Sequence, residues 1–177
     1  MRRKLTAVMI LGVAIMVTAP TARPVLATPA GGGFASTTIA LGRFGDINVF
    51  NHLIPPDFWK SRHHSDIWLS LQKTKGLSDV YVQSNVFPPG ATSGWHTHPG
   101  HSLIIVAAGK VTAYEGDDLE CRPQVYTQGM GFVDPGGGHV HNLRNEDTVE
   151  ARTIVVQVIP ADAVRRIDAL DPGNCSF

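Results

Sequence analysis

The sequence predicts an all-β protein, a sandwich or a barrel, and three observations lead to this fold class. Short runs rich in β-branched and aromatic residues recur from residue 37 onward. Turns that contain glycine and proline, such as residues 88–90 and 135–138, separate these runs. No stretch has the periodicity of a long amphipathic helix. Many short strands of this kind build either a sandwich or a barrel, and these observations leave both open.

The N-terminal segment has the pattern of a secretory signal peptide. Basic residues at positions 2–4 precede an almost wholly apolar run over residues 5–19. This run is shorter than the roughly 20 apolar residues that a membrane span needs. We therefore expect residues 1–27 to be a signal peptide that is removed after Ala27, so that the protein is exported. Cleavage after Ala30 and a retained N-terminal anchor are the alternatives.

The mature chain is expected to start with a flexible leader. Residues 28–36 are small and glycine-rich, and they contain little that could form a core. Residues 37–177 are then expected to fold as a single domain. Cys121 and Cys175 both lie in this domain, and an oxidising compartment outside the cytoplasm favours a disulfide between them. A reactive thiol is the alternative for either cysteine.

Ten runs bounded by turn residues are expected to form strands. They cover residues 37–41, 46–50, 67–71, 79–87, 95–98, 102–107, 110–115, 131–133, 139–144 and 151–159. The last run is apolar on both faces from residue 154 except at Gln157, which predicts a central, buried strand. Residues 58–64 are expected to form a helical turn or loop, and residues 161–168 a short C-terminal helix or tail.

Five of the eight histidines lie in two short segments. His96, His98 and His101 belong to the first segment, and His139 and His141 belong to the second. Because residues i and i+2 of a strand face the same side, His96 should project with His98, and His139 with His141. Neutral imidazole is a good ligand for zinc, copper, iron and nickel, so pairing of these two strands would create a metal site. Surface or hydrogen-bonded core histidines are the alternative interpretation.

The spacing around these histidines resembles the two motifs of the cupin superfamily. Residues 90–109 follow the pattern G-x5-H-x-H-x3-S-x6-G, and residues 129–145 follow G-x5-P-x-G-x3-H-x3-N. The second pattern has one extra residue between its glycine and its histidine. The resemblance implies a small exported single-domain cupin, folded as a double-stranded β-helix or jelly-roll barrel with a metal site inside.

Carried over position by position, the resemblance implies that His96, His98 and His141 are metal ligands. The glutamate of the first motif falls on Ser102, whose hydroxyl is a poor ligand for a divalent ion. Three outcomes stay open. A three-histidine site would hold Fe, Zn, Ni, Cu or Mn with open positions, similar to the three-histidine cupin dioxygenases. Either His139 or His101 would supply a fourth nitrogen, or the site would be a polar pocket without metal.

Other residues near the motifs carry weaker expectations. Trp95 should point away from the histidines and pack in the barrel, whereas Ile104 shares the parity of Ser102 and should line the pocket floor. Gln157 is either a donor beside the site or a satisfied core amide. Asp134 lies in a predicted turn and is expected to be either solvated or turn-forming.

Two classes of function follow from this site. The first is a metal-dependent enzyme of dioxygenase-like or related type, with His139 as the candidate general base. The second is a non-catalytic module that binds a metal or a small ligand. Lys plus Arg and Asp plus Glu number 15 each, so no basic surplus indicates nucleic acid as a partner. We expect a small-molecule ligand, no membrane association after signal cleavage and, by family analogy, a possible homodimer.

Overall fold

The structure is a computed structural model that describes residues 27–53 and 68–177. The expected signal peptide, apart from Ala27, and the expected turn at residues 58–64 lie outside the described residues. None of the described residues belongs to a helix that is long and apolar enough to cross a membrane.

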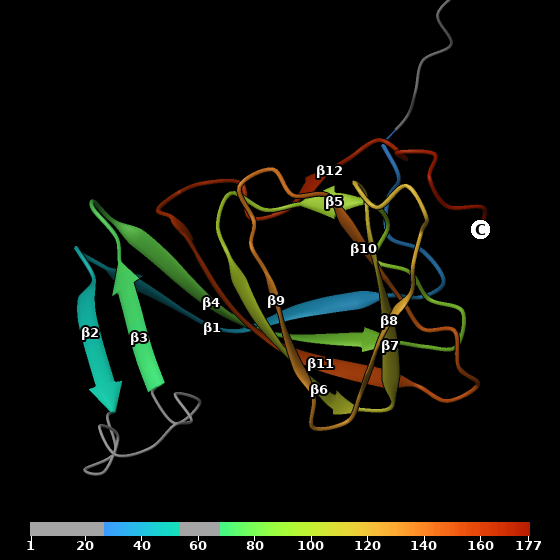
Figure 1. Ribbon diagram of the computed structural model, residues 1–177, viewed down its shortest axis with the longest axis horizontal. Coiled ribbons are helices and arrows are strands. Elements are labelled where there is room, and N and C mark those ends of the chain that lie inside the picture. The colour runs from blue at the N-terminus through green and yellow to red at the C-terminus, as the bar shows by residue number, and fades with distance from the viewer. Residues whose placement is uncertain (1–26, 54–67) are drawn as a thin grey trace, which may run out of the picture.

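The described residues form twelve strands and no helix (Figure 1). The strands are β1 (Ala35–Phe44), β2 (Asn48–Leu53), β3 (Trp68–Lys73), β4 (Ser78–Phe87), β5 (His96–Thr97), β6 (Ser102–Ala108), β7 (Lys110–Glu115), β8 (Gln124–Thr127), β9 (Gly131–Asp134), β10 (His141–Arg144), β11 (Ala151–Pro160) and β12 (Ile167–Asp168). All ten expected strands are present with small shifts at their ends. β8 and β12 were not expected, and residues 161–168 form turns and β12 instead of a short helix.

Two five-stranded antiparallel sheets make the barrel. One has the order β1-β4-β11-β6-β9 and the other has the order β12-β5-β10-β7-β8. The hydrophobic core joins the two sheets, because Phe87 and Val106 of the first sheet pack in one cluster with Val111 and Leu143 of the second. This arrangement is the double-stranded β-helix expected from the sequence.

β11 is the central strand of the first sheet, as its apolar sequence predicts. It pairs with β4 on one side and with β6 on the other. The register places Gln157 of β11 opposite Ser102 of β6, and Ser102 opposite Asp134 of β9. Three polar side chains therefore cross three neighbouring strands at one level of the sheet, and all three are buried.

The segment that the sequence predicts to be a flexible leader lies against the barrel. The Thr28 amide donates a hydrogen bond to the Ala169 carbonyl at 2.9 Å, and Gly31 forms a β-bridge with Thr92. The Phe34 ring packs on Phe87 with 4.7 Å between ring centroids. Residues 28–36 are therefore ordered, and β1 begins at Ala35, two residues earlier than expected.

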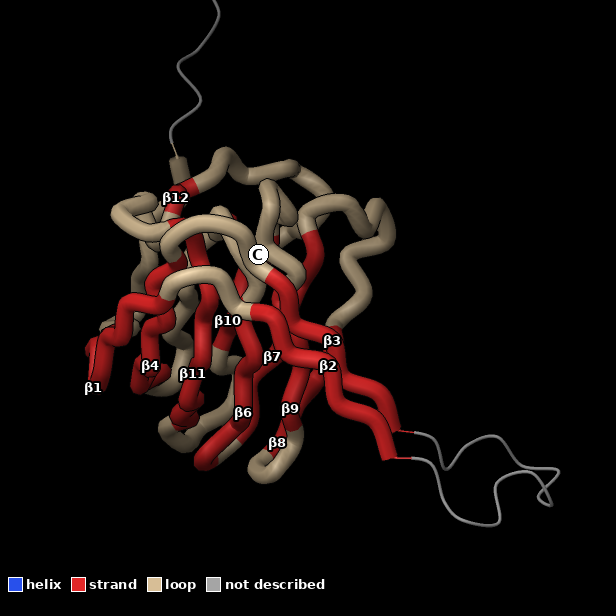
Figure 2. Tube along the Cα trace, turned by 90° about the vertical axis from the view of Figure 1, so that its left-hand side faces the viewer, coloured by secondary structure: helices blue, strands red, loops and turns tan. Residues whose placement is uncertain are grey.

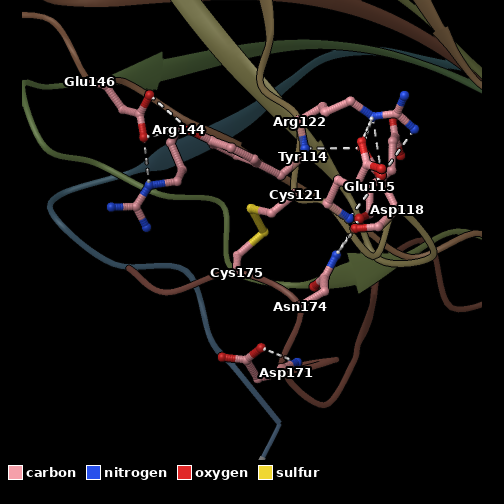
Figure 3. The surroundings of a disulfide bond; sticks show 12 residues. Tyr114, Glu115, Asp118, Cys121, Arg122, Arg144, Glu146, Asp171, Asn174 and Cys175 are labelled. Atoms are coloured by element: carbon pink, nitrogen blue, oxygen red, sulfur yellow. Dashed lines mark hydrogen bonds and ion pairs between the residues drawn. A yellow bond between two sulfur atoms is a disulfide. The ribbon is translucent and has the colours of Figure 1, made fainter.

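The C-terminal tail is fastened to the barrel beside β7. Cys121 and Cys175 form the disulfide that the sequence predicts (Figure 3). The Asn174 side-chain amide donates to the backbone carbonyls of Glu115 and Asp118 at 2.9 and 2.7 Å. These contacts hold the tail by groups that are far from it in sequence.

Phe177, the last residue of the tail, packs on Trp95, the residue that precedes β5. The Phe177 ring stacks on Trp95, with 6.2 Å between centroids, and the Arg144 guanidinium lies 4.0 Å above the same ring. Trp95 is buried and faces away from the neighbouring histidine, as strand alternation predicts.

The strands β2 and β3 form a separate two-stranded sheet. This hairpin extends away from the barrel (Figure 2). Its apolar side chains are largely exposed, including Phe50, Leu53 and Leu71. The hairpin therefore adds nothing to the barrel interior in which the histidines lie.

Candidate metal centre

Three histidines meet inside the barrel. His96 of β5 pairs directly with His141, the first residue of β10, and His98 follows one residue after β5 ends. All three side chains are buried, and one nitrogen from each lies within 4.8 Å of the others. The strand alternation that predicts a common direction for His96 and His98 agrees with this geometry.

Hydrogen bonding directs one nitrogen of His96 and one nitrogen of His98 away from the cluster. Nδ1 of His96 lies 2.8 Å from the Gly94 carbonyl oxygen, and Nδ1 of His98 lies 2.7 Å from the Arg165 carbonyl oxygen. A carbonyl only accepts, so Nδ1 carries the proton in both rings and Nε2 keeps a free lone pair. In metal sites, a hydrogen bond from the ring nitrogen that does not bind the metal orients the histidine in this way.

His141 has a carboxylate in the corresponding place. Its Nδ1 lies 3.5 Å from Oδ1 of Asp134 and makes no hydrogen bond within ordinary distance. The nearest acceptor is therefore an anion rather than a carbonyl. An aspartate in this position favours a proton on Nδ1 and leaves Nε2 as the ligand atom.

Burial keeps the three rings neutral at physiological pH. Desolvation lowers the pKa of His96 well below its usual value, with a further contribution from the neighbouring His141. Desolvation also lowers the pKa of His98, and it lowers that of His141 to about 4. Metal binding requires unprotonated imidazole, so these rings need not lose a proton before they bind a metal near pH 7.

Asp134 is buried beside the histidines. Of the two roles predicted for it, the turn-forming one is present, because its side chain accepts from the amide two residues further on, whereas the solvated one is wrong. It is the last residue of β9 and only 4% exposed. The Gly136 amide donates to Oδ1 at 2.9 Å, and the Ser102 hydroxyl donates to Oδ2 at 3.3 Å. Oδ2 also lies 3.9 Å from Nε2 of His98. Asp134 and the half-buried Phe132 are two residues apart, so their side chains face the same side of β9. This spacing could have indicated from the sequence that Asp134 faces inward.

Ser102 connects this carboxylate to the central strand. Its hydroxyl accepts a hydrogen bond from Nε2 of Gln157 at 3.0 Å and donates to Asp134. The position at which the cupin motif has glutamate thus holds a hydrogen-bond donor to an aspartate from the next strand. Gln157 is the donor beside the site, which decides between the two interpretations of this residue.

His139 and His101 lie outside the three-histidine cluster. The His139 Nε2 atom is 3.2 Å from Oε2 of Glu115, and its Nδ1 is 3.8 Å from Oδ1 of Asp134. With Asp134 and His141 it forms a second group whose ligand atoms lie within 4.8 Å of one another. Neither His139 nor His101 lines the cavity that adjoins the cluster.

A cavity of about 50 Å³ lies against the three histidines. Its apolar wall includes Ile104, as strand parity predicts, and its polar wall includes Gln83, Asn85 and Gln157. Two cationic side chains, Arg165 and Arg166, also line it. The cluster is therefore open on one side to a small, mixed polar and apolar space.

The comparisons with known proteins agree with the fold. Residues 85–157 match the family model described as the cupin domain, and this span contains both motifs and all three clustered histidines. This part of the chain is therefore a cupin domain. A comparison with curated proteins finds no match.

Solved structures with a similar fold come from several bacteria. One is an uncharacterised conserved protein with a double-stranded β-helix domain from Klebsiella pneumoniae, at 21% identity over 51% of this chain and 74% of that chain, with a TM-score of 0.43. A cupin-like protein from Thermotoga maritima has 23% identity over 52% and 65%, with a TM-score of 0.44. A DMSP lyase from Ruegeria pomeroyi has 18% identity over 53% and 45%, with a TM-score of 0.45.

Proposed function

We propose that this protein is an exported cupin that binds one divalent transition metal through His96, His98 and His141. The observation that carries the proposal is the orientation of the three buried imidazoles. Nδ1 of His96 and of His98 lies within hydrogen-bond distance of a backbone carbonyl, and Nδ1 of His141 lies 3.5 Å from the Asp134 carboxylate. Burial lowers the pKa of all three rings, so they are neutral near pH 7. This combination is the one that metal ligation by Nε2 requires.

The donor set fits a transition metal better than calcium or magnesium. Three imidazole nitrogens suit Fe, Zn, Ni, Cu or Mn, whereas calcium and magnesium prefer oxygen ligands. Asp134 adds a negative charge next to the site, which offsets part of the charge of a divalent ion. Three protein ligands leave coordination positions for water or a small molecule, as in catalytic metal sites.

The cavity favours a metal-dependent small-molecule enzyme over a purely structural site. A metal bound here would supply Lewis acidity or a binding position for oxygen or water. The chain itself contributes the rest. The backbone carbonyls of Gly94 and Arg165 orient two ligands, while Ile104 and the other apolar residues of the wall limit access of water. A dioxygenase-like reaction is the enzyme class that the three-histidine pattern favours, and a non-catalytic binding module is the alternative that an absence of turnover would support.

His139 is retained as the candidate general base, with a defined route to the site. Its ring contacts Glu115 and Asp134 rather than the cavity. A proton could pass between His139 and the site through Asp134 only after the 3.8 Å separation of His139 Nδ1 and Asp134 Oδ1 shortens to hydrogen-bond distance. His139→Gln should leave metal content unchanged and reduce turnover of any identified substrate.

Metal analysis of the secreted protein tests the proposal. The untagged protein is expected to hold about one transition metal per chain after reconstitution, measured by elemental analysis. His96→Ala and His141→Ala should abolish this binding, because each removes one of three ligands. His101→Ala is the matched control and should retain full metal content. Wild-type protein without metal after reconstitution, or metal content unchanged in the two ligand variants, would overturn the proposal.

A further inference from the structure

The cavity beside the histidines contains a cationic side chain without an acidic partner. The half-buried Arg165 lines the cavity, and its Nη1 donates to the Gln83 side-chain oxygen at 2.7 Å. Within residues 27–53 and 68–177, no carboxylate lies within 4.0 Å of its guanidinium. Its neighbour Arg166 differs, because it pairs with Asp168 at 2.7 Å and donates to the Ser93 carbonyl at 2.6 Å.

A partly buried charge without a counterion is costly, which gives an anionic ligand an advantage. Burial lowers the pKa of Arg165, but a guanidinium remains protonated in proteins. Planar guanidinium groups bind carboxylates through two parallel hydrogen bonds, so a carboxylate is the matching anion.

Two amide oxygens in the cavity wall lack hydrogen-bond partners. The Asn85 amide nitrogen donates to Thr153 at 3.3 Å, and the Gln157 amide nitrogen donates to Ser102 at 3.0 Å. The remaining oxygens, Oδ1 of Asn85 and Oε1 of Gln157, are buried and unpaired. Buried acceptors are normally satisfied, so they are suited to a hydroxyl donor on a ligand.

The size of the cavity limits the ligand. A volume of about 50 Å³ accommodates roughly three to five water-sized groups, at 10–15 Å³ each. A carboxylic acid with one hydroxyl group and two or three carbon atoms has about five or six non-hydrogen atoms, at or just above the upper end of this range. Larger ligands would require the wall to move.

We propose that the cavity binds a small hydroxycarboxylate, with its carboxylate on Arg165 and its hydroxyl directed to Asn85 or Gln157. This assignment names the class of ligand for the proposed metal centre. The hydroxycarboxylate is a substrate only if the proposed metal-dependent function is correct. The contact with Arg165 itself requires no metal. The Arg165 backbone carbonyl, which orients His98, is retained in any side-chain variant.

Calorimetric titration of matched small molecules tests the assignment. Lactate is the probe, lactamide is its neutral counterpart, and propionate lacks the hydroxyl group. Metal-reconstituted wild-type protein is expected to bind lactate at least tenfold more tightly than lactamide and severalfold more tightly than propionate. Arg165→Met should reduce lactate affinity at least tenfold and leave metal content unchanged. Arg152→Met is the control, because Arg152 is exposed and pairs with Glu150.

The outcomes separate this inference from the metal proposal. Equal affinity for lactate and lactamide, or unchanged lactate affinity in Arg165→Met, would overturn the assignment even if metal is bound. If the wild-type protein binds no metal, the metal proposal fails. The metal-free protein then still tests the assignment through the loss of lactate binding in Arg165→Met.

Discussion

At the scale of single residues, a carboxylate from a neighbouring strand lies where the cupin glutamate is missing. Ser102 occupies the glutamate position and donates to Asp134, which lies opposite it in the sheet. The negative charge is therefore present near the histidines although the motif lacks it. Its source is β9 rather than β6, and its attachment to Ser102 and Gly136 holds it beside His141.

The charge of Asp134 should strengthen metal binding. Asp134→Asn keeps the size of the side chain and an oxygen that can accept from Gly136, but removes the charge. We expect metal affinity to fall by about 10–100-fold, the range typical of residues that support metal ligands. Competition with a chromogenic chelator measures this change. Asp171→Asn, at an exposed position in the tail, is the control, and equal affinities of the two variants would contradict the role of Asp134.

The buried histidines also predict how stability depends on pH in the metal-free protein. Burial lowers the pKa of His141 in the folded state to about 4 from its usual value of 6.5, so the unfolded chain binds more protons between these two pH values. The contribution of neutral His141 to the free energy of unfolding should therefore be fully present above pH 6.5 and should be lost as the pH drops toward 4. The loss from His141 alone is on the order of 3 kcal/mol.

Urea denaturation at pH 7.5, 5.5 and 4.5 measures this dependence. His141→Gln removes the titrating group and should flatten part of the curve. A pH dependence in His141→Gln identical to that of the wild type would show that His141 does not contribute.

At the scale of elements, alternation within strands predicted the directions of side chains within one strand. It could not predict contacts between residues that are far apart in the sequence. The common direction of His96 and His98 and the inward position of Ile104 follow from a period of two. Asp134 was missed because the strand was expected to end one residue earlier, at Val133. No local pattern could reveal that the Arg165 carbonyl orients His98, since these residues are 67 positions apart.

The turn between β9 and β10 is an element whose geometry the site requires. Gly136 has φ of 64°, and a Cβ there would collide with the Gly100 carbonyl oxygen. Gly137 has φ of 65° and open space around it. Gly137→Ala should therefore cost about 1–2 kcal/mol from backbone strain alone, and Gly136→Ala should cost more because the backbone must also shift.

Thermal or chemical denaturation of these two variants measures the difference. Gly136→Ala should also weaken metal binding. The backbone shift moves the residue 136 amide, which donates to Asp134 and holds this carboxylate beside the histidines. Equal stability of the two variants would contradict the predicted collision.

At the scale of the whole molecule, both ends of the described chain are attached to the strand that carries the histidines. The Thr28 hydroxyl accepts a hydrogen bond from the Trp95 amide at 2.9 Å, and Phe177 covers the Trp95 ring. The disulfide in the tail agrees with an oxidising location outside the cytoplasm. Strand β5, which carries His96, is only two residues long and makes few backbone hydrogen bonds. The contacts of Thr28 and Phe177 with Trp95 therefore help to hold it in place.

The contacts of Thr28 favour one of the two expected cleavage sites. Removal of the signal peptide after Ala27 keeps Thr28 and its bonds to Trp95 and Ala169, whereas cleavage after Ala30 removes them. We expect N-terminal sequencing of the secreted protein to begin at Thr28. A sequence that begins at Gly31, or retention of residues 1–27, would contradict this expectation.

Arg165 would give the two proposed binding events, of the metal and of the organic acid, a common structural element. Its carbonyl orients His98, and its guanidinium faces the cavity. Any shift of this residue on ligand binding acts on the metal ligand as well, and thermodynamic reciprocity then applies. If bound metal raises the affinity for the organic acid by some factor, bound acid raises the affinity for the metal by the same factor. The fraction of protein with an occupied centre would then depend on the concentrations of the metal and of the organic acid together, rather than on either one alone.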